Sequence, residues 1–184
     1  MKTIAVFGSA VVIPSAPEYF AAVAMGKALA EAGYAVMTGG YEGIMGAVSK
    51  GAAEVGGEVV GVTVGASAQL AERVPNPWLT QCIEHPTMRL RLHHLVDEAD
   101  GYVVMPGGIG TLQEVGEAWQ HLRACGQRKP MVAYGPLWRQ VLQPLKDCDY
   151  VPSELADMLV FCNTTEDTLA VINAVLGTNE VEAS

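Results

Sequence analysis

The chain has 184 residues, a mass of 19.4 kDa and a formal charge of −9, from 20 acidic and 11 basic residues. This length suits one domain with a substantial core, and a surface of this sign repels a nucleic-acid backbone, so no nucleic-acid partner is expected. Half of the residues are hydrophobic and 20 are glycines, which is typical of strands that are buried on both faces and joined by tight turns.

Short apolar runs alternate with longer segments of helical period along the chain, which is the pattern of repeated βα units. The apolar runs predict strands over 4–7, 35–37, 59–64, 102–105, 131–133 and 159–161. The segments of helical period predict helices over 18–32, 43–55, 87–98, 111–125, 137–147 and 166–176. We therefore predict a single α/β domain over residues 1–178, with a Rossmann-like, doubly wound, mainly parallel sheet flanked by helices. Residues 179–184 are predicted to be a flexible tail.

The stretch 65–86 interrupts this alternation. Pro75 and Pro77 predict an irregular loop there, with one extra short strand around residues 79–83. Loops of this length are often functional.

The cysteines are Cys82, Cys125, Cys148 and Cys162. They include no CxxC pair, so neither a zinc site nor a redox pair is indicated, and the histidines have no metal-ligand spacing either. We expect reduced, mostly buried thiols in a cytoplasmic protein. No apolar run approaches the roughly 20 residues that cross a bilayer, so no membrane partner is expected.

Glycine-bearing turns follow the first, second and fourth of these strands, at 7–10, 37–43 and 105–111. In a parallel sheet such turns lie at one edge, and ligands bind outside that edge where the strand order reverses. Glycine leaves backbone N–H groups accessible, and the following helix adds its unpaired first-turn amides, so phosphate is the expected guest. The candidate phosphate- or nucleotide-binding residues in these turns are Gly8, Ser9, Gly39, Gly40, Gly43, Gly107, Gly108, Gly110 and Thr111.

The turns do not match the best-known phosphate motifs. No Gly-Lys-Ser/Thr follows any of them, and the first gives no GxGxxG, so P-loop ATPases and ordinary dehydrogenases are disfavoured. For any single turn, the alternative that its glycines only close a tight βα connection remains open.

Glu114 follows the third glycine turn by one turn of helix, so its carboxylate should lie close to a bound phosphate. Such a pair of anions needs a compensating cation. Arg91 and Arg89 border opposite sides of the apolar face of the helix predicted at 87–98, and periodicity alone does not choose between them.

Residues 106–114 read PGGIGTLQE, and with this PGGxGTxxE motif the chain resembles the Lonely Guy family, long mislabelled as lysine decarboxylases. The likeness runs from about residue 4 to about residue 176. Within it, TGGYEGIMG at 38–46 resembles the family's GGGxxGLMG turn, and MRLRL at 88–92 resembles its MxxRK segment.

Members of this family hydrolyse the N-glycosidic bond of a nucleoside 5′-monophosphate, in the plant-hormone case a cytokinin riboside monophosphate, and release the base and ribose 5-phosphate. The resemblance therefore implies a phosphoribohydrolase for a cytokinin-type or purine nucleoside monophosphate that uses no metal or organic cofactor. It assigns the catalytic roles to Arg91 and Glu114, which decides against Arg89, and it places Met88 among the nucleotide-binding residues. It also implies a homodimer packed through helices near the site.

The chain departs from the family pattern at two positions. Leu92 replaces the lysine that follows the arginine, and Thr38 replaces the first glycine of the second turn. A similar glycine turn occurs in molybdenum-cofactor carrier proteins, so the alternative is a non-catalytic nucleotide- or molybdenum-cofactor-binding protein. The sequence leaves the preferred base open.

An amino-acid decarboxylase is excluded at this stage. Pyridoxal phosphate would require a lysine near the phosphate edge, and the lysines of the chain all lie outside the glycine turns, at Lys2, Lys27, Lys50, Lys129 and Lys146.

Overall fold

The computed structural model describes residues 1–65, 74–125 and 129–177. Within them, one sheet of 7 parallel strands runs in the order β4-β3-β2-β1-β5-β6-β7. The strands are β1 (Thr3–Phe7), β2 (Ala35–Thr38), β3 (Val59–Val64), β4 (Gln81–His85), β5 (Gly101–Val104), β6 (Met131–Tyr134) and β7 (Leu159–Cys162). The tail predicted at 179–184 lies outside the described residues.

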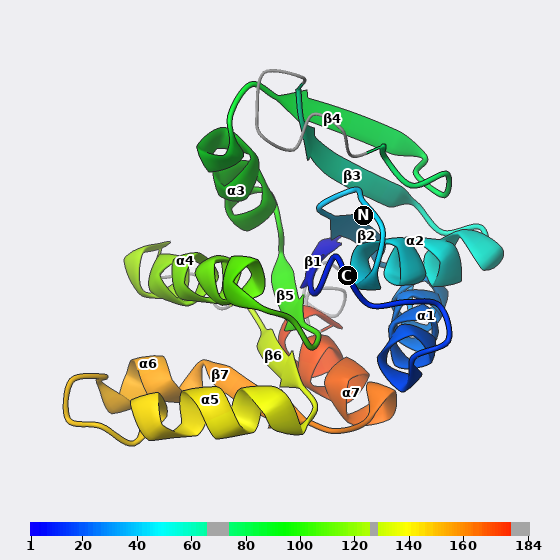
Figure 1. Ribbon diagram of the computed structural model, residues 1–184. Coiled ribbons are helices and arrows are strands. Elements are labelled where there is room, and N and C mark those ends of the chain that lie inside the picture. The colour runs from blue at the N-terminus through cyan, green and yellow to red at the C-terminus, as the bar shows by residue number, and fades with distance from the viewer. Residues whose placement is uncertain (66–73, 126–128, 178–184) are drawn as a thin grey trace, which may run out of the picture.

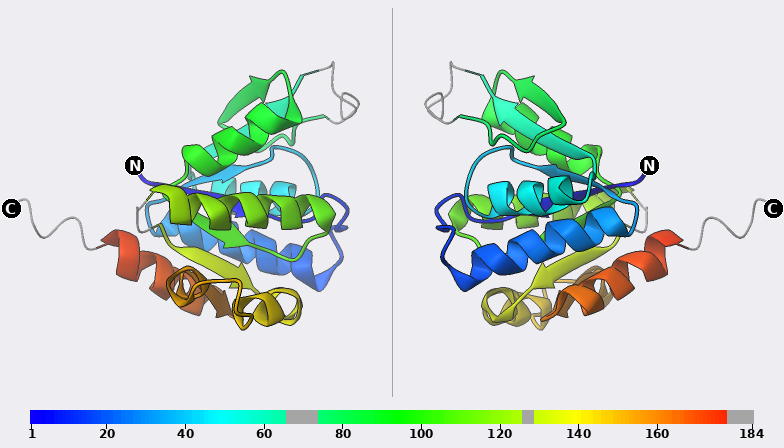
Figure 2. Two further views of the ribbon diagram at one scale, coloured as in Figure 1. Left: turned by 90° about the vertical axis from the view of Figure 1, so that its left-hand side faces the viewer. Right: turned by 90° about the vertical axis from the view of Figure 1, so that its right-hand side faces the viewer.

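Helices cover both faces of this sheet. Figure 1 shows α1, α2 and α7 on one side, and α3, α4, α5 and α6 on the other. Their bounds are α1 (Pro17–Glu31), α2 (Ile44–Glu54), α3 (Met88–Asp97), α4 (Ile109–Cys125), α5 (Pro136–Lys146), α6 (Ser153–Asp157) and α7 (Thr165–Leu176). The two side views of Figure 2 show α4 lying along one face and α1 with α2 along the other. The predicted doubly wound α/β fold is confirmed.

The alternation of side chains along each strand produces two cores, one under each helical layer. In β1, Ala5 and Phe7 belong to the core beneath α3, α4 and α5, whereas Ile4 and Val6 belong to the core beneath α1, α2 and α7. Successive residues of a strand point to opposite faces, so a strand that is buried on both sides needs apolar residues throughout. This is why the strands inside the sheet could be recognised as short, mainly apolar runs.

The predicted elements agree closely with the structure, with two differences. The extra strand is present but covers 81–85 rather than 79–83, and the short helix α6 was not predicted. Cys82 is exposed because it lies on this edge strand, and Cys148 is partly exposed, so the expectation of mostly buried thiols is wrong. Cys162 is buried as expected. None of the described helices is long and apolar enough to cross a membrane.

The strand order reverses between β1 and β5. In the sheet, β1 lies between β2 and β5. Helix α1, which follows β1, and helix α4, which follows β5, pack on opposite faces. The turns after these two strands therefore diverge and leave a crevice at the carboxyl edge. This is where the sequence placed the ligand.

Candidate active site

A cavity of about 350 Å³ opens at this crevice. The β1–α1 turn, the β2–α2 turn, α3 and the start of α4 form its walls, so residues far apart in the sequence meet there. The lining residues are Gly8, Ser9, Ala10, Val11, Tyr41, Met45, Met88, Arg91, Leu92, Gly108, Gly110, Thr111, Gln113 and Glu114.

The start of α4 presents backbone to the cavity. A β-carbon at Gly108 or Gly110 would meet no other atom within 4 Å, so the surface there is open to a ligand. Gly107 differs, because a β-carbon at this residue would overlap the side chain of Thr111. The first amides of a helix have no partner within the helix and carry the positive end of its dipole, so this surface suits an anion.

Ser9 joins the three glycine turns. Its N–H donates to the carbonyl of Pro106 at 3.1 Å, and its own carbonyl accepts the N–H of Ile44 at 2.8 Å. Its hydroxyl oxygen accepts the N–H of Val11 at 3.2 Å, which leaves the hydroxyl hydrogen for a ligand. The turns therefore form one connected backbone frame around the cavity.

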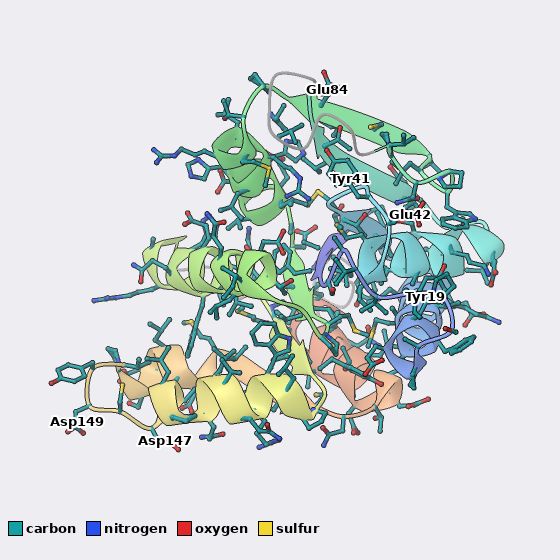
Figure 3. All side chains as sticks on the ribbon, in the orientation of Figure 1. Tyr19, Tyr41, Glu42, Glu84, Asp147 and Asp149 are labelled. Atoms are coloured by element: carbon teal, nitrogen blue, oxygen red, sulfur yellow. The ribbon has the colours of Figure 1, made fainter. Side chains whose placement is uncertain are left out.

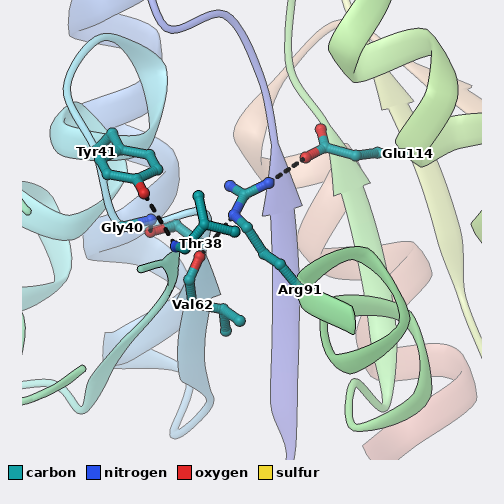
Figure 4. A network of polar contacts seen from close by, with 7 residues as sticks. Thr38, Gly40, Tyr41, Val62, Arg91 and Glu114 are labelled. Atoms are coloured by element: carbon teal, nitrogen blue, oxygen red, sulfur yellow. Dashed lines mark hydrogen bonds and ion pairs between the residues drawn. The ribbon is translucent and has the colours of Figure 1, made fainter. Parts of the chain in front are cut away.

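Arg91 is the buried cation of the site. Only 5% of the residue is exposed, and its Nε donates to the carbonyl oxygen of Val62 at 2.7 Å. Its Nη1 lies 3.8 Å from Oε1 of Glu114 (Figure 4). Arg89 is exposed on the same helix, so the choice that periodicity left open corresponds here to a difference in burial.

Glu114 combines burial with a neighbouring positive charge. Its side chain is 14% exposed, and burial raises the pKa of Glu114 to about 7, while the guanidinium of Arg91 acts in the opposite direction. Desolvation therefore outweighs the ion pair. A carboxyl group with this pKa can gain and lose a proton near neutral pH, which suits a general base.

The glycines of the β2–α2 turn lie behind the cavity wall, to which this turn contributes Tyr41. Gly39 packs against the guanidinium of Arg91, Gly40 and Gly43 have φ of 79° and 74°, and none of the three is among the residues that line the cavity. The N–H of Gly40 donates to the hydroxyl oxygen of Thr38 at 3.1 Å. Thr38 thus caps a turn amide from the place where the family pattern has glycine.

Two further residues of this region were not singled out from the sequence. Tyr41 is 3% exposed and lines the cavity, with its ring centroid 5.8 Å from Cζ of Arg91. Asn76 is 3% exposed, and its side-chain amide donates to the carbonyl of Tyr41 at 3.1 Å and to Oγ of Ser49 at 3.3 Å. An aromatic residue inside a glycine turn and an asparagine in an irregular loop were the available signals.

Of the remaining predicted residues, Met88 and Thr111 line the cavity and Gly107 does not. Met88 and Leu92 line it from α3, Leu92 being 8% exposed where the family pattern has a lysine. Within the described ranges, no group of three or more histidine, cysteine, aspartate or glutamate side chains could hold a metal ion.

The lysines lie elsewhere. Lys27 and Lys50 pair with glutamates four residues on, and Lys2, Lys129 and Lys146 donate to the carbonyls of Leu176, Asp97 and Leu159. None of them lines the cavity.

The model of a family described as "possible lysine decarboxylase" matches residues 45–172, which include Arg91 and the whole PGGIGTLQE motif. The chain belongs to this family, the Lonely Guy family. Its resemblance to the family, predicted from the motifs, is thereby confirmed.

Curated relatives of the Lonely Guy family match most of the chain. A protein of Mycobacterium tuberculosis named cytokinin riboside 5′-monophosphate phosphoribohydrolase is 32% identical over 155 residues, 80% of this chain and 81% of its own. A protein of Mycobacterium marinum with the same name is 31% identical over 177 residues, 91% of either chain.

Among solved structures, the molybdenum cofactor carrier protein of Chlamydomonas reinhardtii superposes with a TM-score of 0.74 at 24% identity. The superposition covers 96% of this chain and 99% of that protein. At this identity the likeness establishes a shared fold.

Proposed function

We propose that this protein hydrolyses the N-glycosidic bond of a purine or cytokinin-type nucleoside 5′-monophosphate to the free base and ribose 5-phosphate. The observation that carries the proposal is the position of Glu114. This buried carboxylate lies one helical turn after an open anion-binding backbone and beside a buried arginine. The names of the mycobacterial relatives, which match 80% or more of the chain, support the same reaction.

In the proposed complex the 5′-phosphate lies on the amides at the start of α4. The hydroxyls of Ser9 and Thr111 add side-chain hydrogen bonds to it. Because Glu114 follows this turn closely on the same helix, the ribose then lies beside its carboxylate. Fixing the phosphate in this way orients the sugar for reaction and removes much of the entropic barrier.

Water attacks C1′ of the ribose as the bond from C1′ to the base nitrogen breaks, so the sugar develops oxocarbenium character. Ionised Glu114 stabilises this positive charge and takes a proton from the attacking water. The departing base takes a proton from solvent, and Glu114 returns to solvent the proton that it took from the water, so the atoms of one water molecule are divided between ribose 5-phosphate and the base. Burial alone disfavours the anion of Glu114, and the positive charge of Arg91 favours it. Arg91 also keeps the side chain of Glu114 oriented.

We also propose that the protein is a cytoplasmic homodimer that packs through α3 and α4. Met88, Leu90 and Leu112 expose 42%, 46% and 37% of their surface on these helices beside the cavity. Apolar residues gathered at one surface favour an interface. Light scattering after size exclusion should give twice the chain mass for the wild type and a smaller mass for Leu90→Asp.

The free thiols of Cys82, Cys148 and Cys162 are consistent with a reducing compartment.

The test is chromatographic detection of free base and ribose 5-phosphate after incubation with AMP, GMP, CMP, UMP and N6-isopentenyl AMP. Glu114→Gln is the inactive variant, and Glu117→Gln, an exposed glutamate of the same helix, is its matched control. Release that is lost only in Glu114→Gln supports the proposal and ranks the bases. If no substrate is cleaved but native mass spectrometry detects a retained ligand, the carrier alternative replaces it.

A further inference from the structure

Tyr41 is fixed at both ends. Its carbonyl accepts the amide of Asn76 at 3.1 Å, and its hydroxyl oxygen accepts the N–H of Val64, at the end of β3, at 3.0 Å. Figure 3 marks Tyr41 between α2 and α3, where its ring reaches the cavity wall. These two hydrogen bonds restrain the position of Tyr41 at the cavity wall.

Arg91 is anchored to the same strand. Its Nε donates to the carbonyl of Val62, two residues before the backbone amide that holds Tyr41. The ring centroid of Tyr41 lies 5.8 Å from its Cζ, within the range of a cation–π interaction. Figure 4 shows the guanidinium between Tyr41 and Glu114.

The guanidinium of Arg91 lies closer to the carbonyl oxygen of Val62 than to the carboxylate of Glu114. At 3.8 Å the contact with Glu114 exceeds the 2.7–2.9 Å of a charge-assisted hydrogen bond, whereas the bond to Val62 measures 2.7 Å. The ion pair alone therefore does not set where the guanidinium lies. The end of β3 contributes to this position directly through Val62 and indirectly through Tyr41.

We propose that Tyr41 is a positioning residue, which holds the guanidinium of Arg91 against β3 at the distance from Glu114 that hydrolysis requires. This inference rests on the proposed function and adds a residue to it. It assigns to Tyr41 an effect on turnover that is exerted through Arg91 and not through the base of the substrate.

Tyr41 can affect the pKa of Glu114 only through the charged groups that surround this carboxyl. Within the described part of the chain, Arg91 of α3 is the charged group that shifts the pKa of Glu114. His93 and Glu117 of the same two helices pair on the surface, as do Asp97 and His121. From the β2–α2 turn, Tyr41 is the titratable side chain that lines the cavity.

Two substitutions separate the parts of Tyr41. Tyr41→Phe removes only the hydroxyl that accepts the N–H of Val64, and Tyr41→Leu also removes the aromatic face. Matched controls are Tyr34→Phe and Tyr34→Leu, because Tyr34 is 8% exposed and donates its hydroxyl to Asn173 at 2.6 Å, at the opposite end of β2.

For Tyr41→Leu, kcat should fall about tenfold with KM within about twofold, equally for every base that the wild type cleaves. A less firmly held guanidinium attracts the carboxylate less, so the pKa of Glu114 rises and the acid limb of the kcat profile moves to higher pH. Tyr41→Phe should lie between the wild type and Tyr41→Leu. A loss in KM, a loss that depends on the base, or an unmoved acid limb would overturn the positioning role.

A double-mutant cycle tests the route of the effect. Adding Tyr41→Leu to Arg91→Ala should cause no further loss of turnover, whereas an additive loss would show that Tyr41 acts independently of Arg91. Titration of the Glu114 carboxyl by ¹³C NMR needs no turnover. A higher midpoint in Tyr41→Leu shows that Tyr41 holds Arg91 beside Glu114, and if the wild type releases no base it is the proposed function that fails. Equal midpoints refute the positioning role even if hydrolysis is observed.

Discussion

The guanidinium of Arg91 lies against Gly39, in the space that a β-carbon at residue 39 would occupy. Gly39→Ala should therefore displace Arg91 from Val62 and Glu114 and lower turnover by about 100-fold or more. Base release by the variant measures this effect. The combined Gly39→Ala, Arg91→Ala variant should be no less active than Arg91→Ala alone, and a Gly39→Ala variant with wild-type turnover would contradict the arrangement.

The raised pKa of Glu114 predicts how the stability depends on pH. The folded state holds the carboxyl proton more tightly than the unfolded chain, so the contribution of this group to stability is fully present below pH 4.5 and is lost as pH rises through about 7. Glu114→Gln removes this titration. The free energy of unfolding of the variant, measured relative to that of the wild type, should therefore be about 1–3 kcal/mol higher at pH 8 than at pH 4. Urea unfolding at both pH values measures the difference, and parallel pH dependences would show that the carboxyl is not buried.

Gly110 offers a test of the phosphate position, because its β position is open and it lies within the first turn of α4. Gly110→Ala should stabilise the helix by up to about 1 kcal/mol, yet raise KM for a nucleoside monophosphate about tenfold by occupying ligand space. Gly116→Ala on the same helix, also with open space, is the control that should stabilise without changing KM. An unchanged KM in Gly110→Ala would indicate that the phosphate binds elsewhere.

Asn76 should be more important to stability than its place in an irregular loop suggests. Its side chain binds the carbonyl of Tyr41 and the N–H of Trp78, and both would lose these partners in Asn76→Ala. The expected cost is about 1–3 kcal/mol of unfolding free energy, together with reduced turnover, because the turn that carries Tyr41 loosens. Denaturant unfolding of Asn76→Ala beside the exposed Asn163→Ala checks both the size and the location of the effect.

The fold was predictable from the sequence because the sheet is buried on both faces. Strands such as β3 are then continuous apolar runs, and glycines mark their carboxyl ends. Helix α6 escaped because 5 residues are too few to show a helical period. The predicted position of β4 was wrong by two residues, because this edge strand is largely exposed and has no apolar run of its own.

The candidate site was predictable where the chemistry lies in the backbone. Open glycines at the start of α4 and the carboxylate of Glu114 follow from spacing along one helix. The pairing of Arg91 with Glu114 joins two helices, and helical period left Arg89 equally possible until the family resemblance was considered. Tyr41 could not be predicted, because its contacts with Val64 and Arg91 depend on how three separate elements pack together.

The end of β3 holds both Arg91 and Tyr41 by main-chain atoms, yet neither Val62 nor Val64 lines the cavity. A mutational library restricted to the cavity wall would therefore leave out the strand that supports the geometry of the candidate site. Substitutions in β3 that shift its backbone by a few tenths of an ångström could change turnover without altering any ligand contact. In variants selected for a new base, compensating changes should accordingly appear in β3 as well as in the lining residues.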